Sequence, residues 1–188
     1  MQLKPEILVK KNGIIVNTCA CIVIYMTIAS MAETRSNDPK GPMYVLCPYI
    51  QTISSIQSTY MEEEGDRLWE VSCKDTYSYK HIMSCYTTPH VNCFKESTTF
   101  ICPFNSIISG MQSYFSESAK DRRWRFTCCH QVYFCLQDCV WTAYKNNPEK
   151  AFKYNLQKDM YLSGLKSYYD KATKDRRWKF MLCKKRSC

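Results

Sequence analysis

The 188-residue sequence contains only five glycines, which excludes collagen-like repeats and glycine-rich low-complexity segments. It also lacks the short motifs of common enzyme sites, since it has no phosphate-binding glycine loop, no His-Glu-x-x-His and no Gly-x-Ser-x-Gly. Hydrophobic residues make up 45% and charged residues 23% of the chain, which are the proportions of a folded globular protein. The composition therefore favours a folded protein that is not an enzyme, and no cofactor is expected.

Long hydrophobic runs are also scarce, because only residues 14–31 approach the length of a membrane span. Basic residues precede this run, and Ser30-Met31-Ala32 places small residues at the −3 and −1 positions of a cleavage site before Glu33. This layout predicts a secretory signal peptide over residues 1–32 and an exported chain over residues 33–188. Two alternatives stay open: the segment is a signal anchor retained in the membrane, or the start of the chain is mispredicted.

Cysteine, by contrast, is abundant, with 13 residues in the chain and 11 of them after residue 32. An exported chain meets an oxidising compartment, so disulfides are the default expectation, although an odd number cannot pair completely within one chain. Zinc is the alternative, because potential ligands gather at two places: Cys85, His90 and Cys93, and Cys128, Cys129, His130, Cys135 and Cys139. The sequence has no Cys-x-x-Cys knuckle, so we expect no metal site. Catalytic use of a cysteine with His81, His90 or His130 is not expected either, because nothing marks a thiol of low pKa.

Three related segments repeat along the exported chain, at approximately residues 44–73, 99–128 and 156–183. A shift of 55 residues aligns the first with the second, and a shift of 54 aligns the second with the third. In the first two copies an opening and a closing cysteine lie 26 residues apart. In the third copy Leu156 stands at the opening position, and Cys183 lies one residue beyond the closing position.

Each copy ends in the period-two alternation of a β-strand. In the second copy Trp124, Phe126 and Cys128 alternate with polar residues, which places these three side chains on one face of a strand. The preceding apolar segment predicts the partner strand, and a polar stretch predicts the turn. We therefore predict a mainly β fold, with three pseudo-repeated, disulfide-clipped β-hairpins in one compact domain around a pseudo-threefold core. Irregular, cysteine-rich connections are expected over residues 74–98 and 129–155, and a β-bulge is expected just before Cys183.

An Asp-Arg-x-Trp motif occurs at the same place in all three copies. Its residues are Asp66, Arg67 and Trp69, then Asp121, Arg122 and Trp124, and then Asp175, Arg176 and Trp178. In the structural interpretation the arginine packs on an aromatic ring and binds turn carbonyls or the carboxylate of another copy. In the functional interpretation the three Arg–Trp pairs are equivalent sugar sites. We favour the structural interpretation, because a trio that recurs in every repeat is more often part of the repeat's architecture.

These motifs resemble the dermatopontin family. The resemblance is carried by three Asp-Arg-x-Trp copies that close on a cysteine, an adjacent Cys128-Cys129 pair and Cys135-x-x-x-Cys139, and it covers about residues 44–188. The family includes extracellular-matrix proteins and haemagglutinating cell-aggregation factors. This sequence departs from vertebrate dermatopontin, because it is basic rather than acidic, it begins the exported chain without a tyrosine-rich segment, and it has one cysteine more than the family's even number.

Repeat equivalence predicts two disulfides, Cys47–Cys73 and Cys102–Cys128, because the same hairpin should be closed in the same way. The family pattern implies that Cys135 and Cys139 pair with Cys183 and Cys188, in an order that stays open. Cys129 is then left with either Cys85 or Cys93. Because Cys85 lies nearer the family spacing, the resemblance favours Cys85–Cys129, with Cys93 unpaired.

Positive charge is concentrated toward the C-terminus, since residues 33–119 carry a formal charge of −4 and residues 120–188 carry +11. Strand alternation places four basic residues on the faces opposite their tryptophans: Arg123, Arg125, Arg177 and Lys179. The first copy has Leu68 and Glu70 at the matching positions, so the repeat itself does not require basic residues there. We predict that the four residues bind sulfated glycans as part of one continuous basic surface. A solvated face without a ligand is the alternative, and nucleic acid is not expected as a partner.

The resemblance implies a secreted protein of the extracellular space or matrix that acts in cell adhesion. Its expected partners are matrix proteins or proteoglycans, sulfated glycosaminoglycans and the cell surface. The alternative is a lectin-like haemagglutinin or cell-aggregation factor in innate defence. The sequence has no Arg-Gly-Asp motif to support integrin binding, and residues 33–188 contain no Asn-x-Ser/Thr sequon. It leaves the oligomeric state open, a homo-oligomer included.

Overall fold

The computed structural model describes residues 37–188, and the expected signal peptide lies outside these described residues. The described residues form eleven β-strands: β1 (Met43–Leu46), β2 (Gln51–Met61), β3 (Asp66–Asp75), β4 (Met83–Thr87), β5 (Thr98–Ile101), β6 (Ile107–Ser116), β7 (Asp121–Gln131), β8 (Cys135–Trp141), β9 (Phe152–Asn155), β10 (Met160–Asp170) and β11 (Asp175–Arg186). Within this part of the chain no helix is long and apolar enough to cross a membrane. The predicted mainly β fold is confirmed.

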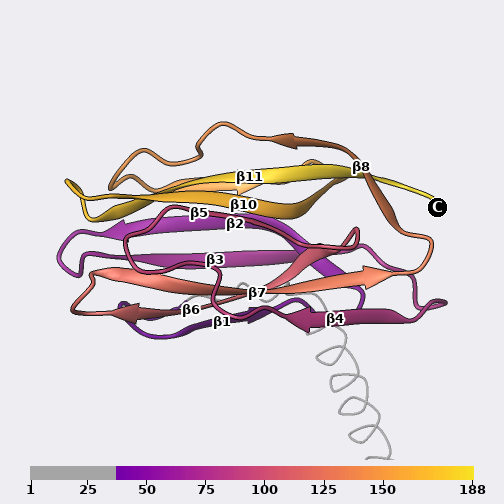
Figure 1. Cartoon of the computed structure of the whole chain (residues 1–188), viewed down its shortest axis with the longest axis horizontal. Coiled ribbons are helices and arrows are strands. Elements are labelled where there is room, and N and C mark those ends of the chain that lie inside the picture. The colour runs from indigo at the N-terminus through magenta and orange to yellow at the C-terminus, as the bar shows by residue number, and fades with distance from the viewer. Residues whose placement is uncertain (1–36) are drawn as a thin grey trace, which may run out of the picture. The chain divides into compact units, whose positions relative to one another are not determined.

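The strands form three antiparallel sheets, in the orders β1-β6-β7-β4, β5-β10-β11-β8 and β3-β2-β9. Each sheet is built on one long hairpin, which is β2–β3, β6–β7 or β10–β11 (Figure 1). These hairpins are the three predicted repeats. The cysteine-rich connections are more regular than the sequence suggests, because they contain the strands β4 and β8, which pair with the second and third hairpins.

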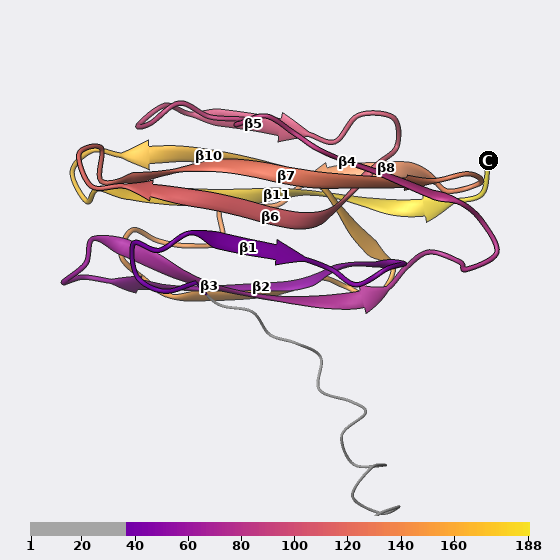
Figure 2. The ribbon, with the colours of Figure 1, turned by 90° about the horizontal axis from the view of Figure 1, so that it is seen from below.

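The short strand before each hairpin pairs with the hairpin of another copy. β1 precedes the first hairpin in the chain but pairs with β6 of the second, and β5 likewise pairs with β10 of the third (Figure 2). β9 closes the cycle, because it precedes the third hairpin and pairs with β2 of the first. Each sheet therefore contains strands from two copies, so no single repeat can complete its own sheet.

A β-bulge occurs at the same place in every hairpin. The strand register of the third copy therefore differs from the register expected from the sequence. The extra residue lies in the first strand of each hairpin, at Ser54, Ser109 and Ser163. The expected bulge just before Cys183 in β11 is therefore wrong, since the irregularities around this cysteine lie in β10 and β8. As a result, Leu182 occupies the place of Cys128, and Cys183 corresponds to Cys129.

Five disulfides join the sheets and their outer strands: Cys47–Cys73, Cys85–Cys129, Cys102–Cys128, Cys135–Cys188 and Cys139–Cys183. Cys47 and Cys102 directly follow β1 and β5, so their disulfides tie one sheet to the hairpin of the next rather than closing a single hairpin. At the third position of this type the chain has Leu156 and Leu182; Leu182 belongs to the apolar core, and Leu156 is half-buried against it. Cys93 is free and exposed.

This substitution of two leucines for a disulfide leads to a prediction. Replacing Leu156 and Leu182 together by cysteine should form a third inter-sheet disulfide, because these residues lie 26 positions apart, as in the other two copies. A disulfide that closes a loop of this length stabilises by about 3 kcal/mol. The matched control replaces the same two leucines by serine, which removes the same apolar contacts without forming a bond.

Thermal unfolding and thiol counting would measure the outcome. We expect one free thiol in the cysteine double variant, that of Cys93, and a higher Tm than in the serine double variant. Three free thiols in the folded protein would show that the pseudo-threefold equivalence of these positions is wrong.

Candidate functional site

The tryptophans of the three copies meet at the centre of the molecule. The ring centroids of Trp69, Trp124 and Trp178 lie 5.1–5.3 Å apart, and each pair is T-shaped. This arrangement sets the positive edge of one ring toward the negative face of the next. The side chains are only 1–2% exposed, so their faces are not available to stack against a sugar.

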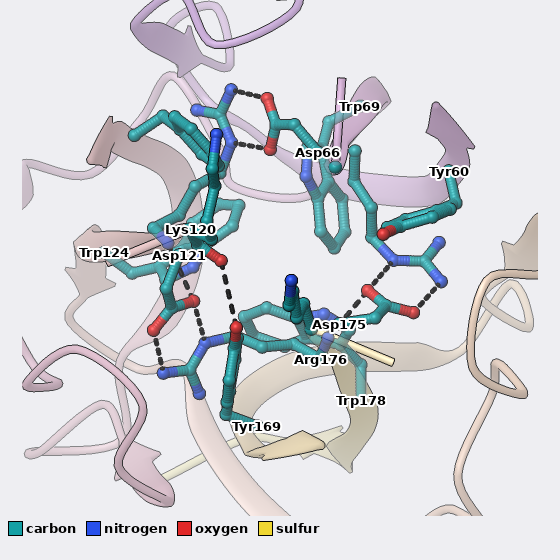
Figure 3. A pocket seen from close by; sticks show the side chains of 15 residues that line it. Tyr60, Asp66, Trp69, Lys120, Asp121, Trp124, Tyr169, Asp175, Arg176 and Trp178 are labelled. Atoms are coloured by element: carbon teal, nitrogen blue, oxygen red, sulfur yellow. Dashed lines mark hydrogen bonds and ion pairs between the residues drawn. The ribbon is translucent and has the colours of Figure 1, made fainter. Parts of the chain in front are cut away.

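The Asp-Arg pairs form a closed ring around these tryptophans (Figure 3). Arg122 binds Asp66, Arg176 binds Asp121 and Arg67 binds Asp175, each through Nε and Nη2 at 2.5–2.7 Å. Every copy therefore gives its arginine to one neighbour and its carboxylate to the other. These are buried, bidentate ion pairs, the strongest type of charge-assisted hydrogen bond in proteins.

Each guanidinium group is also occupied by groups outside the ion pair. Arg67, Arg122 and Arg176 lie 5.5–5.8 Å from the ring centroids of Tyr60, Phe115 and Tyr169, respectively. Their remaining N–H groups donate to the main-chain carbonyls of Lys150, Gly41 and Glu96. These contacts are those of the structural interpretation, and the three arginines are only 4–5% exposed, so they offer little surface to a sugar.

An asparagine that the sequence analysis missed completes the arrangement in each copy. Asn92 accepts the main-chain N–H of Trp124 through its side-chain oxygen and donates to the carbonyl of Arg122, at 2.8 and 2.9 Å. Asn37 and Asn146 make the same two bonds in the other copies. The three asparagines are 55 and 54 residues apart, the same shifts that relate the repeats, and this spacing could have revealed them. They lie just before the segments that define the repeats.

A small cavity lies on the axis beside the tryptophans, and its wall is drawn in Figure 3. Its volume of about 30 Å³ suits a water molecule rather than a sugar ring. The indole Nε1 atoms of the three tryptophans find no hydrogen-bond partner in the part of the chain that the structure describes. The Asp-Arg-x-Trp residues therefore form a packed core whose cavity is too small for a sugar ring.

The four basic residues predicted to bind glycans lie on the outer faces of two sheets. Arg123 and Arg125 belong to β7, in the sheet β1-β6-β7-β4, whereas Arg177 and Lys179 belong to β11, in the sheet β5-β10-β11-β8. The contacts of the two pairs have no residue in common. The two pairs therefore lie on strands of two different sheets.

The second-copy face combines its arginines with a histidine and aromatic rings. The side chain of Arg123 bonds the carbonyl of Asn92 at 3.0 Å and lies over Phe94, while Arg125 is exposed. A groove of about 360 Å³ runs beside Arg125 and His90. Burial, then Arg125 and Arg123, lower the pKa of His90, so this imidazole responds to the local positive potential.

The third-copy face combines its cations with a different set of rings. The guanidinium of Arg177 lies 5.0 Å from the ring centroid of Tyr144 and donates to the hydroxyl of Tyr168. The ammonium of Lys179 lies 5.3 Å from Tyr144 and 5.8 Å from Trp141. Trp141 and Tyr144 were not among the predicted site residues, because both lie in the connection over residues 129–155 that was expected to be irregular.

Comparison with known proteins gives consistent matches. The dermatopontin family model matches residues 37–188. The chain is 32% identical to a hemagglutinin/amebocyte aggregation factor of Limulus polyphemus, over 92% of this chain and 99% of that protein. It is 30% identical to a dermatopontin of Biomphalaria glabrata, over 79% and 98%, and 28% identical to Millepora cytotoxin-1 of Millepora dichotoma, over 84% and 70%.

The closed ring of ion pairs yields a second prediction. Replacing Asp121 by alanine should lower the free energy of unfolding by about 3–5 kcal/mol, because it leaves the guanidinium of Arg176 buried without its carboxylate. Urea unfolding followed by tryptophan fluorescence would measure the loss. Glu117→Ala is the control, since it removes an exposed carboxylate that pairs with Lys120 and should change little. Equal effects of the two variants would contradict the architectural role of the ring.

Proposed function

Because the chain belongs to the dermatopontin family, we propose that it is a secreted adhesion protein that binds matrix components or sulfated glycans through the outer faces of its sheets. The family match and the relatives named dermatopontin support an extracellular-matrix role, and five disulfides suit an exported protein. The relatives carry three different names, so the proposal uses only the adhesion role that the family match supports. The role is binding rather than catalysis.

The single observation that carries the glycan proposal is the contrast between the outer faces of the three hairpins. The Asp-Arg-x-Trp residues are the same in all copies, but the outer positions hold Arg123 and Arg125 in the second, Arg177 and Lys179 in the third, and Leu68 and Glu70 in the first. Packing does not require basic residues at these positions. A partner with negative charge is a physical reason for them.

Sulfate groups suit these side chains chemically. The planar guanidinium group offers paired donors to two oxygens of one sulfate, and lysine adds a point charge. Both faces also hold the cations near aromatic rings, which are apolar surfaces for the C–H groups of a sugar. A sulfated glycosaminoglycan chain offers both chemistries along its length.

The agglutinin alternative is favoured by a specific observation, namely that the basic residues lie on two different sheets. A molecule with two separate binding faces can hold two glycan chains, and therefore two cells or two matrix elements, at once. The first relative reported above is named a hemagglutinin and aggregation factor. Bridging by this single chain would need no oligomer, although an oligomer would increase the number of faces.

The proposal predicts a loss of heparin binding when one face is neutralised. Replacing Arg123 and Arg125 together by serine should lower the salt concentration at which the protein elutes from heparin, and it should reduce the slope of affinity against salt. Stability should stay nearly unchanged, because Arg125 is exposed and Arg123 is not part of the core. Elution at the wild-type salt concentration would reduce this face to a solvated surface.

Two controls separate the face from the overall charge. Replacing the exposed Lys158 and Lys171 by serine removes the same charge elsewhere and should shift elution less. Replacing Leu68 and Glu70 by serine changes the matching positions of the first copy, and it should not weaken binding. A uniform loss in all charge-reducing variants would show that net charge alone retains the protein.

His90 supplies a further prediction on the same face. Burial lowers the pKa of His90 most, and the positive potential of Arg125 and Arg123 lowers it further; bound sulfate should raise this pKa because it offsets that potential. By linkage, heparin affinity should then increase as the pH falls through the titration range of the imidazole. An NMR titration of the His90 ring, with and without a heparin oligosaccharide, would measure the shift. An unchanged pKa on saturation would place the ligand elsewhere.

Secretion is tested by the N-terminus of the protein recovered from the medium. Removal of residues 1–32 should leave a chain that begins at Glu33, and intact-mass measurement would detect it. A full-length chain that stays with the membrane fraction would support the retained anchor instead.

A further inference from the structure

A second groove lies on the sheet that carries Arg123 and Arg125, and it meets the groove beside Arg125 at Tyr44. A groove of about 440 Å³ crosses the outer face of the sheet β1-β6-β7-β4, between its two edge strands. This volume is within the usual range of small-molecule sites. The lining contains no Asp, Glu, Lys, Arg or His side chain, which distinguishes it from the basic faces. Its chemistry is aromatic and hydroxyl instead.

Three tyrosines provide the aromatic part of this groove. Tyr44, Tyr49 and Tyr86 line it and are 58%, 56% and 41% exposed, respectively. Exposed rings on an otherwise rigid sheet cost energy in water and offer ready contact area to a ligand. Gly110 lies close beneath two lining residues, since a Cβ there would come within 2.9 Å of the main-chain oxygen of Val45 and within 3.1 Å of Leu46 and Thr127.

A buried hydroxyl on the groove wall points to a ligand independently. The side chain of Ser109 lines the groove and is 2% exposed, yet its Oγ has no hydrogen-bond partner among the described residues. Leaving a buried hydroxyl unpaired costs free energy, and a ligand that offers a partner recovers it. Thr87 and Thr127, whose hydroxyls lie 2.9 Å apart, add two more polar groups on the same surface.

From these contacts we infer that the groove binds an uncharged sugar residue. The apolar C–H face of a pyranose packs on tyrosine rings, and its hydroxyls pair with side-chain hydroxyls such as that of Ser109. A sulfated sugar would find no cation here. The inference does not depend on the sulfated-glycan proposal, because it uses uncharged side chains in a separate groove of the same face, although Tyr44 lines both this groove and the one beside Arg125.

The corresponding surface of the next sheet lacks these features. The shifts of 55 and 54 residues place Thr99, Phe104 and Val140 where the groove has Tyr44, Tyr49 and Tyr86. Ser163 replaces Ser109, but its hydroxyl is within hydrogen-bond distance of the carbonyl of Ser106. The groove therefore belongs to one sheet, and its neighbour supplies matched control positions.

Saturation-transfer NMR with uncharged methyl glycosides would test the inference, using glucose, galactose, mannose and N-acetylglucosamine derivatives at high salt. We expect at least one glycoside to bind, and Tyr49→Ala and Tyr86→Ala each to weaken it about tenfold. Ser109→Ala should weaken it about three- to tenfold without lowering the Tm, because the hydroxyl has no partner in the free protein. Phe104→Ala and Ser163→Ala should leave binding unchanged.

Several outcomes would overturn the inference. No transfer from any of the four glycosides would do so, and so would equal losses in the groove variants and their controls. Displacement of the bound glycoside by heparin at high salt would place the sugar on a basic face. Heparin retention at low salt is measured separately, so failure of the sulfated-glycan proposal and failure of this one are distinguishable.

Discussion

The fold depends on a closed ring in which each arginine binds the carboxylate of a different copy. A buried ion pair contributes little net stability when complete, but removal of one partner is costly. Because Arg122, Arg176 and Arg67 reach Asp66, Asp121 and Asp175 in turn, the charges are satisfied only when all three hairpins are in place. The ring therefore selects one assembly of the repeats, and the three tryptophans inside it fill the core that this assembly creates.

The exchange of short strands has the same consequence at the level of the sheets. β1, β5 and β9 each pair with a hairpin that is not their own, and the disulfides Cys47–Cys73 and Cys102–Cys128 bridge neighbouring sheets. Loss of one inter-sheet disulfide in the third copy is tolerated because Leu182 lies in the core and Leu156 packs against it instead. Because the ion-pair ring, the exchanged strands and the inter-sheet disulfides all fix the centre, the outward-facing residues are free to differ between copies.

Sequence reasoning was successful where the signal is local and failed where it is not. The alternation around Trp124 predicts a strand with a buried face, and the repeats predict three hairpins, both of which the structure contains. Aligning the repeats by their closing cysteines pairs Cys183 with Cys128. The strand pairing instead matches Cys183 to Cys129. A one-residue slip in a strand moves a side chain to the other face, and cysteine identity alone does not reveal such a slip. Strand exchange and the direction of the Arg–Asp ring involve residues far apart in the chain, for which the pattern within one copy has no signal. Trp141 and Tyr144 were missed for a related reason, since they join Lys179 only through tertiary packing.

The difference between a repeated core and unrepeated outer faces bears on how the protein engages its surroundings. A threefold-repeated sugar site would have required the motif residues to be exposed, whereas Trp69, Trp124 and Trp178 are buried. The outer faces instead differ in chemistry, with cations on strands of two sheets and a tyrosine-lined groove on one of these sheets. Unequal faces on one rigid domain can engage a sulfated chain and an uncharged sugar at the same time, and linked engagement strengthens binding beyond that of either face alone. Adhesion by this chain would then arise from combining weak, chemically different contacts rather than from repeating one strong contact.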